Sequence, residues 1–110
     1  MATKFTVDYF IKKFEATYHQ QWCMHSFVSV SGKRFCAAGF CGMISRSTKT
    51  PEAEALMNLF KVGFIKDVIF SESVDGCNDA KGRWAQYEKT PRRRILKALR
   101  AIKGAMQNEA

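Results

Sequence analysis

The chain has 110 residues, a length that fits one domain, and its 46% hydrophobic and 13% aromatic residues are enough to build one core. This composition excludes wholesale disorder, and no apolar run reaches the roughly 18 residues that a membrane-spanning helix needs. The formal net charge of +8 indicates an acidic partner. We expect a single domain over residues 1–110, with an ordered core from about residue 5 to residue 106.

Residues 6 to 18 predict an amphipathic helix. Its apolar residues recur at the three- and four-residue spacing of one helix face, and they are Val7, Phe10, Ile11, Phe14 and Tyr18. Thr6 is the expected N-cap, and Asp8 stands in the first turn, where a negative charge is favoured.

The next segments alternate between short strands and helices. Residues 22 to 30 are rich in aromatic and β-branched residues, which predicts a short strand, and Val68-Ile69-Phe70 is the second strand candidate. Residues 35 to 44 predict a short buried helix because their small side chains allow close packing, although Gly39 and Gly42 weaken a helix interior.

Two further helices begin with the same pair of residues. Thr50-Pro51 and Thr90-Pro91 each place an N-cap threonine before a proline at the first helical position. Between these helices, residues 75 to 79 predict a turn, and residues 83 to 89 predict a loop that carries Trp84 and Tyr87. The last helix has an apolar stripe of Ile95, Leu99, Ile102 and Met106, and the chain after about Gln107 is expected to fray.

These elements predict a small α+β domain with about four helices and a short two-stranded sheet, and the alternative is a small all-α domain. The expected core residues are Phe10, Phe14, Phe35, Leu56, Leu59, Ile95, Leu99 and Ile102.

The positive charge is concentrated near the end of the chain. Lys81 to Lys103 holds nine basic residues and one acid, whereas the rest holds nine of each and is neutral. Arg92, Arg93 and Arg94 stand at the positive end of the last helix's dipole, an arrangement that disfavours the helix slightly and favours a functional role. The candidate residues for binding nucleic acid or an acidic protein are Arg83, Trp84, Lys89, Arg92, Arg93, Arg94, Lys97 and Arg100. The alternative is a merely solvated basic face.

The four cysteines are interpreted through the expected compartment, because cytosolic thiols stay reduced whereas an even count in a secreted chain would suggest disulfides. No signal peptide is evident, so we expect a cytoplasmic chain whose cysteines are small core residues and which folds without a disulfide. The spacing of His19, Cys23 and His25 matches no standard zinc site, so no metal and no cofactor are expected.

A thiol nucleophile at Cys36 with His25 as base is a weaker alternative, because here the histidine precedes the cysteine. Asn78 and Asp79 are interpreted first as turn residues and second, together with Cys36, as a candidate ligand pocket. No catalytic residue is assigned.

Two pieces of the sequence, Arg34-Phe-Cys-Ala-Ala-Gly-Phe-Cys-Gly and Cys77-Asn-Asp followed by Thr90-Pro-Arg-Arg-Arg-Ile-Leu, occur in a suggestive order. Together they resemble a family of small bacterial and phage-encoded proteins classed as a domain of unknown function. The resemblance covers about residues 5 to 103 and implies a bacterial or phage source, and it implies no activity.

The sequence thus predicts a small non-enzymatic binding protein that contacts nucleic acid through its basic C-terminal helix. Two alternatives remain open. The first is a phage anti-defence or inhibitor protein that binds a host protein or sequesters a small nucleotide, acting in the host cytoplasm. The second is a cysteine-dependent enzyme.

Overall fold

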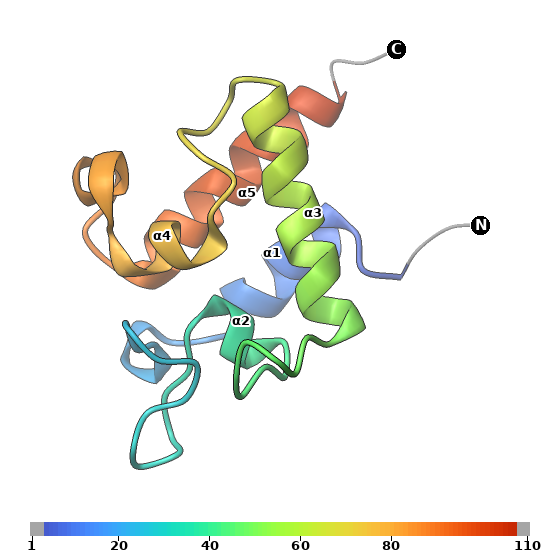
Figure 1. Cartoon of the computed structure of the whole chain (residues 1–110). Coiled ribbons are helices and arrows are strands. Elements are labelled where there is room, and N and C mark those ends of the chain that lie inside the picture. Colours follow the sequence, from blue (N-terminus) through green and yellow to red (C-terminus); the bar gives the residue numbers. More distant parts are fainter. Residues whose placement is uncertain (1–3, 108–110) are drawn as a thin grey trace.

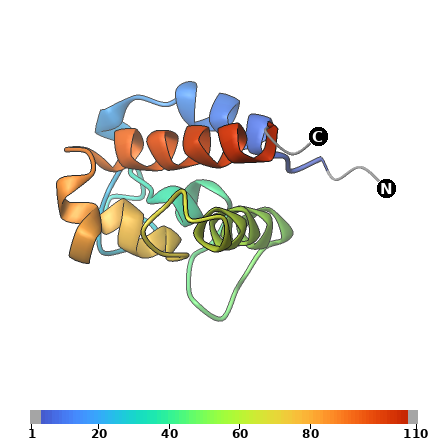
Figure 2. The same cartoon turned by 90° about the horizontal axis from the view of Figure 1, so that it is seen from above.

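The computed structural model describes residues 4–107, and its central element is the long helix α5 (Pro91–Gln107). The preceding helices are α1 (Val7–Glu15), α2 (Ala37–Phe40), α3 (Pro51–Ile65) and α4 (Val74–Asp79), with 3-10 turns at His19–Gln21 and Gly82–Gln86. In Figure 2, α1 lies along one side of α5, while α3 and α4 lie on the other side. The tail that was expected to fray after about Gln107 lies outside the described residues.

Three of the predicted helices begin where the sequence placed them. The hydroxyls of Thr6, Thr50 and Thr90 accept hydrogen bonds of 3.1–3.3 Å from the backbone N–H three residues further on. Each hydroxyl satisfies an N–H group that the first turn of the helix would leave without a partner. Pro51 and Pro91 occupy the first helical positions, where a missing N–H costs nothing.

The predicted short buried helix is α2, and it forms only a single turn. Its small residues have the expected consequence, because a Cβ added at Gly39 would lie 1.9 Å from the Phe27 carbonyl oxygen. Glycine therefore lets α2 lie directly against the 22–30 segment. Cys36 is the N-cap of this turn, and its sulfur accepts a hydrogen bond from Gly39 N.

The core joins all five α-helices of the described chain. Phe10 and Phe14 from α1 meet Leu56 and Phe60 from α3, with Ile95, Leu99 and Ile102 from α5 and Cys77 from α4. Of the expected core residues, Phe35 and Leu59 are only partly buried, and the end of the α5 stripe, Met106, is 40% exposed.

The predicted two-stranded sheet is wrong, and the all-α alternative fits the described residues. Residues 22 to 30 form only isolated bridges, and both of these involve Phe35. Side chains of α4 take the backbone groups that a strand ladder would need: Asn78 Nδ2 donates to Cys23 O, and His25 N donates to Asp79 Oδ1. His25 also adopts a left-handed φ of 69°, which interrupts extended backbone.

The second predicted strand, Val68-Ile69-Phe70, is instead the turn that ends α3. Asp67 adopts a left-handed φ of 60°, and Val68 N donates to Gly63 O across the end of the helix. The turn directs Ile69 into the core, where it is 4% exposed. The apolar run therefore reflects burial rather than strand pairing.

Two segments that were expected to be a turn and a loop contain helical structure instead. Residues 75 to 79 belong to α4, which Ser73 caps by accepting from Gly76 N, and the loop expected at 83 to 89 contains the 3-10 turn Gly82–Gln86. Figure 1 shows α4 and this turn at the end of the molecule where α5 begins. Among the described residues, no helix is both long and apolar enough to cross a membrane.

Candidate functional site

The outer face of α5 carries the basic stripe that the sequence predicts. Arg93, Lys97 and Arg100 are exposed, on the side away from the buried Ile95 and Leu99. With Arg92 they line a shallow hollow of about 400 Å³, which also includes Glu15 and Glu88.

Some of this charge is neutralised by weak surface ion pairs. Arg100 lies 2.7 Å from Glu15, and Lys97 lies 3.6 Å from Glu88. Exposed pairs of this kind contribute roughly 0.2–1 kcal/mol, so a phosphate can replace the carboxylate at small cost. Arg93 is exposed, and no ion pair involves it within residues 4–107.

Arg92 has a structural role at the edge of this hollow. Its Nε and Nη2 donate to the carbonyl oxygens of Phe14 and Glu15 at 3.3 and 3.1 Å. These carbonyls end α1 and have no partner within that helix, so Arg92 acts as a C-terminal cap from the neighbouring helix.

Two residues that the sequence assigned to the binding surface are buried. Trp84 is 2% exposed and donates from Nε1 to Ser71 Oγ at 3.0 Å. Arg94, also 2% exposed, faces inward beside α4. Neither side chain can contact a macromolecule at the surface, so both assignments are corrected. Arg83 and Lys89 are exposed, as expected.

Tyr87 adjoins the basic stripe, as its place among basic residues suggests, and Phe70 rather than Trp84 lies beside it. Phe70, 43% exposed, and Tyr87 line a second hollow of about 360 Å³ together with Arg83, Gln86 and Lys97. Lys97 Nζ lies 4.9 Å from the centre of the Tyr87 ring, within the range of a cation–π contact. The sequence interpretation missed Phe70, which it assigned to a strand; the signal was an aromatic ring directly before the polar run Ser-Glu-Ser.

Buried polar groups fix the region where α4 meets α5. Arg94 donates to the carbonyl oxygens of Cys77, Asn78 and Glu88 at 2.7–2.8 Å. Burial lowers the pKa of this guanidinium, but an arginine remains charged in a protein. A fixed cation therefore holds the C-terminal carbonyls of α4.

Asn78 continues this network toward α2. Its Oδ1 accepts from Ala37 N at 3.0 Å, and its Nδ2 donates to Cys23 O and Asp79 Oδ1, both at 2.9 Å. Asn78 is 1% exposed, so it cannot line an open pocket. Its predicted place in a pocket is wrong, because its amide is used to hold three backbone segments together.

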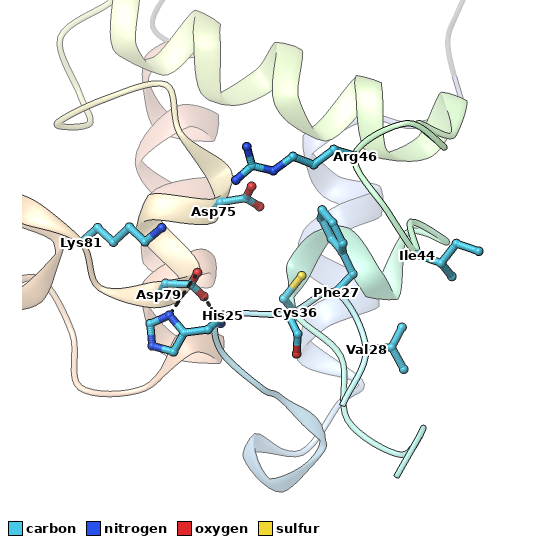
Figure 3. A pocket seen from close by; sticks show the side chains of 10 residues that line it. His25, Phe27, Val28, Cys36, Ile44, Arg46, Asp75, Asp79 and Lys81 are labelled. Carbon is cyan, nitrogen blue, oxygen red and sulfur yellow. Dashed lines mark hydrogen bonds and ion pairs between the residues drawn. The ribbon is translucent and has the colours of Figure 1, made fainter. Parts of the chain in front are cut away.

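A larger pocket of about 520 Å³ opens next to this network (Figure 3). The predicted pocket residues Cys36 and Asp79 do line it. The other lining residues are His25, Ser26, Phe27, Val28, Ile44, Arg46, Asp75 and Lys81. They come from four segments: the 25–28 loop, the start of α2, the loop between α2 and α3, and α4 with the residue that follows its C-cap.

Charged groups of both signs face this pocket. Asp79 Oδ1 accepts from His25 N, and its Oδ2 lies 3.8 Å from His25 Nδ1. In Figure 3 the Arg46 guanidinium and the Lys81 ammonium extend toward the carboxylates of α4. Burial raises the pKa of Asp75, and the Asp79 charge raises it further, while Arg46 and Lys81 act in the opposite direction.

The thiol at the pocket is poorly suited to nucleophilic attack. Burial raises the pKa of Cys36 to about 11, an effect larger than the opposing hydrogen bonds from the Gly39 and Ala38 backbone. The thiolate is the reactive form, so its scarcity near neutral pH disfavours the cysteine-enzyme alternative. Among the described residues, no group of three or more His, Cys, Asp and Glu side chains could hold a metal ion.

Comparisons with protein-family models, curated proteins and solved structures found no match for this chain.

Proposed function

We propose that this protein is a non-enzymatic nucleic-acid-binding protein that contacts single strands through the outer face of α5. The observation that carries the proposal is that two adjoining hollows share Lys97, and that together they contain five basic side chains and two acidic ones. The five bases are Arg83, Arg92, Arg93, Lys97 and Arg100. A basic groove of this kind attracts a phosphate backbone.

The aromatic rings of the second hollow favour a single strand over a duplex. Phe70 and Tyr87 lie in the same hollow as Arg83 and Lys97, so an unpaired base could stack there while neighbouring phosphates contact the cations. Duplex bases are already stacked and paired, and they offer no free face to these rings. The proposal also places the protein in the cytoplasm, where it would meet such a partner.

Salt dependence provides the test. Binding of a labelled mixed-sequence single strand should weaken with salt at a log–log slope of about −0.7 per phosphate contacted. Changing Arg93, Lys97 and Arg100 together to Gln removes three charges from the groove, so the slope should flatten by about 2 units. The measurement is fluorescence anisotropy over a salt series.

A matched control separates the groove from net charge. Changing Lys33, Lys49 and Lys61 together to Gln also removes three exposed charges, but none of these residues lies in either hollow. This control variant should bind the strand with nearly the wild-type slope. The proposal fails if the wild type does not bind at low salt, or if the two triple variants lose affinity equally.

An inhibitor of a host protein is the second candidate function. The ion pairs that the basic stripe already forms with carboxylates favour it. Arg100 and Lys97 already contact Glu15 and Glu88, so an acidic protein surface could exchange with these carboxylates. A single tight partner recovered from host lysate, with no salt-sensitive oligonucleotide binding, would favour this candidate.

A further inference from the structure

We propose that the 520 Å³ pocket between α2 and α4 is a second, independent site that binds a free nucleoside monophosphate, with guanine preferred. The volume lies within the range of small-molecule sites, which is about 300–1,000 Å³. The pocket combines an apolar wall, hydrogen-bond acceptors and cations, and these are the three features that a base linked to a phosphate requires.

The apolar wall consists of Phe27, Val28 and Ile44. Ile44 is 73% exposed, so its side chain is accessible to a ligand at this wall. The Phe27 ring is partly buried and lies above Cys36 in Figure 3, and the Phe27 carbonyl accepts a hydrogen bond from Cys36 N. A flat base can pack against this wall.

The acceptors are the carboxylates of Asp75 and Asp79, one helical turn apart on α4. The Asp79 carboxylate already accepts hydrogen bonds at Oδ1 from His25 N and Asn78 Nδ2. Across the described chain, by contrast, no hydrogen bond or ion pair reaches the Asp75 carboxylate, although it faces the pocket and is half-buried. Guanine presents two adjacent N–H donors that one carboxylate can accept together, whereas uracil presents a single ring N–H.

The cations are Arg46 and Lys81, which approach the pocket from opposite sides in Figure 3. Neither forms an ion pair with a carboxylate within the described residues, so both are available to a phosphate. Lys81 follows Ala80, whose left-handed φ of 59° turns the chain out of α4. A non-glycine residue in that conformation costs about 1 kcal/mol or more, and here it directs Lys81 to the pocket.

The network described above keeps the pocket in place without a ligand. Asn78 ties α2 and the 22–25 backbone to α4, and Arg94 ties the end of α4 to α5. A site that is already formed loses little freedom when it binds, so a small ligand can bind with useful affinity.

Isothermal titration calorimetry of the full chain tests the site with four probes: GMP, UMP, guanosine and inorganic phosphate. GMP should bind more tightly than UMP, and both guanosine and phosphate should bind at least about tenfold more weakly than GMP. No heat from GMP at about 1 mM would overturn the proposal. Phosphate binding as tightly as GMP would also overturn it, because the pocket would then recognise only an anion.

Two substitutions with matched controls locate the contacts. Arg46→Gln should weaken GMP binding about tenfold and leave guanosine binding unchanged, whereas Asp75→Asn should remove the preference for GMP over UMP. The controls are Arg34→Gln and Asp67→Asn, which are exposed, lie outside the pocket and should bind like the wild type. If Arg46→Gln and Asp75→Asn behave like their controls, the site is not this pocket.

The two proposals fail separately. The Arg93, Lys97 and Arg100 triple variant should bind GMP normally, and Asp75→Asn should bind oligonucleotide normally, because the pocket and the α5 hollows share no residue. A chain that binds oligonucleotide but not GMP would retain the proposed function and overturn the pocket.

Discussion

Arg94 shows how a single buried side chain can fix the backbone where two helices meet. Its three carbonyl partners lie at the end of α4 and just before α5, and all three hydrogen bonds are short. Carbonyls at a helix end have no partner within the helix, so a planar group with several fixed donors suits this position. The guanidinium of arginine supplies that geometry, and it also carries the positive charge of this side chain.

We predict that Arg94→Lys destabilises the fold by about 2–4 kcal/mol. Lysine keeps the positive charge, but its single ammonium cannot reach three carbonyls at once, so buried acceptors lose their donors. The measurement is urea denaturation followed by circular dichroism. Arg93→Lys, at the exposed neighbouring position, should change the free energy of unfolding by less than about 0.5 kcal/mol. Equal effects at both positions would mean that the Arg94 hydrogen bonds contribute little.

Helix contacts in this protein depend on glycine where α3 meets α5. A Cβ added at Gly63 would lie 2.6 Å from Ile102 Cγ1 and 3.2 Å from Ile69 Cδ1. Both neighbours are buried, so neither can move away freely. The absence of a side chain at Gly63 therefore sets how closely the two helices approach.

Two glycine-to-alanine changes in these helices should have opposite effects on the free energy of unfolding. Gly63→Ala should destabilise the protein by about 1–3 kcal/mol, because the new methyl group overpacks the core. Gly104→Ala in α5 meets no atom within 4 Å, and it should stabilise the protein by about 0.5–1 kcal/mol, because alanine is the better helix former. Thermal unfolding of both variants provides the measurement. Stabilisation by Gly63→Ala would show that α3 and α5 can separate without cost.

At the scale of the whole molecule, one core connects every α-helix of the described chain, and the two surfaces proposed for binding share no residue. The basic hollow faces α1 and Glu88, while the pocket is formed by α2, α4 and the loops around them. Cys36, Cys41 and Cys77 are buried, and Cys23 is partly exposed. The three buried thiols therefore report on whether the shared core is intact.

We predict that iodoacetamide at pH 7 labels one thiol in the folded protein, Cys23, and four in denaturant. Burial raises the pKa of Cys36 to about 11 and that of Cys41 and Cys77 further, so these thiols are protonated at neutral pH. At Cys36 only about one thiol in 10⁴ would be ionised. Mass spectrometry counts the labels, and Cys23→Ser should leave the folded protein unlabelled. Rapid labelling of Cys36 in that variant would contradict the burial argument and revive thiol chemistry at the pocket.

The sequence by itself determined the local features. Threonine caps and a 3.6-residue apolar period depend on contacts three or four residues apart, so α1, α3 and α5 begin close to where these signals place them. The exposed stripe of Arg93, Lys97 and Arg100 follows from the same period. The same period also places Arg94 on the helix face of Ala98 and Ile102, and all three are buried.

Only the tertiary structure decided that residues 22 to 30 form a loop instead of a strand, and that a pocket lies beside them. Both features depend on partners far apart in the chain. His25 and Asp79 are separated by 54 positions, and Ala37 and Asn78 by 41. Sequence patterns favour residues 22 to 30 as a strand, but hydrogen bonds from α4 side chains hold that backbone as a loop. The burial of Trp84 also depends on tertiary contacts, since its indole packs against Phe70 and donates to Ser71 Oγ.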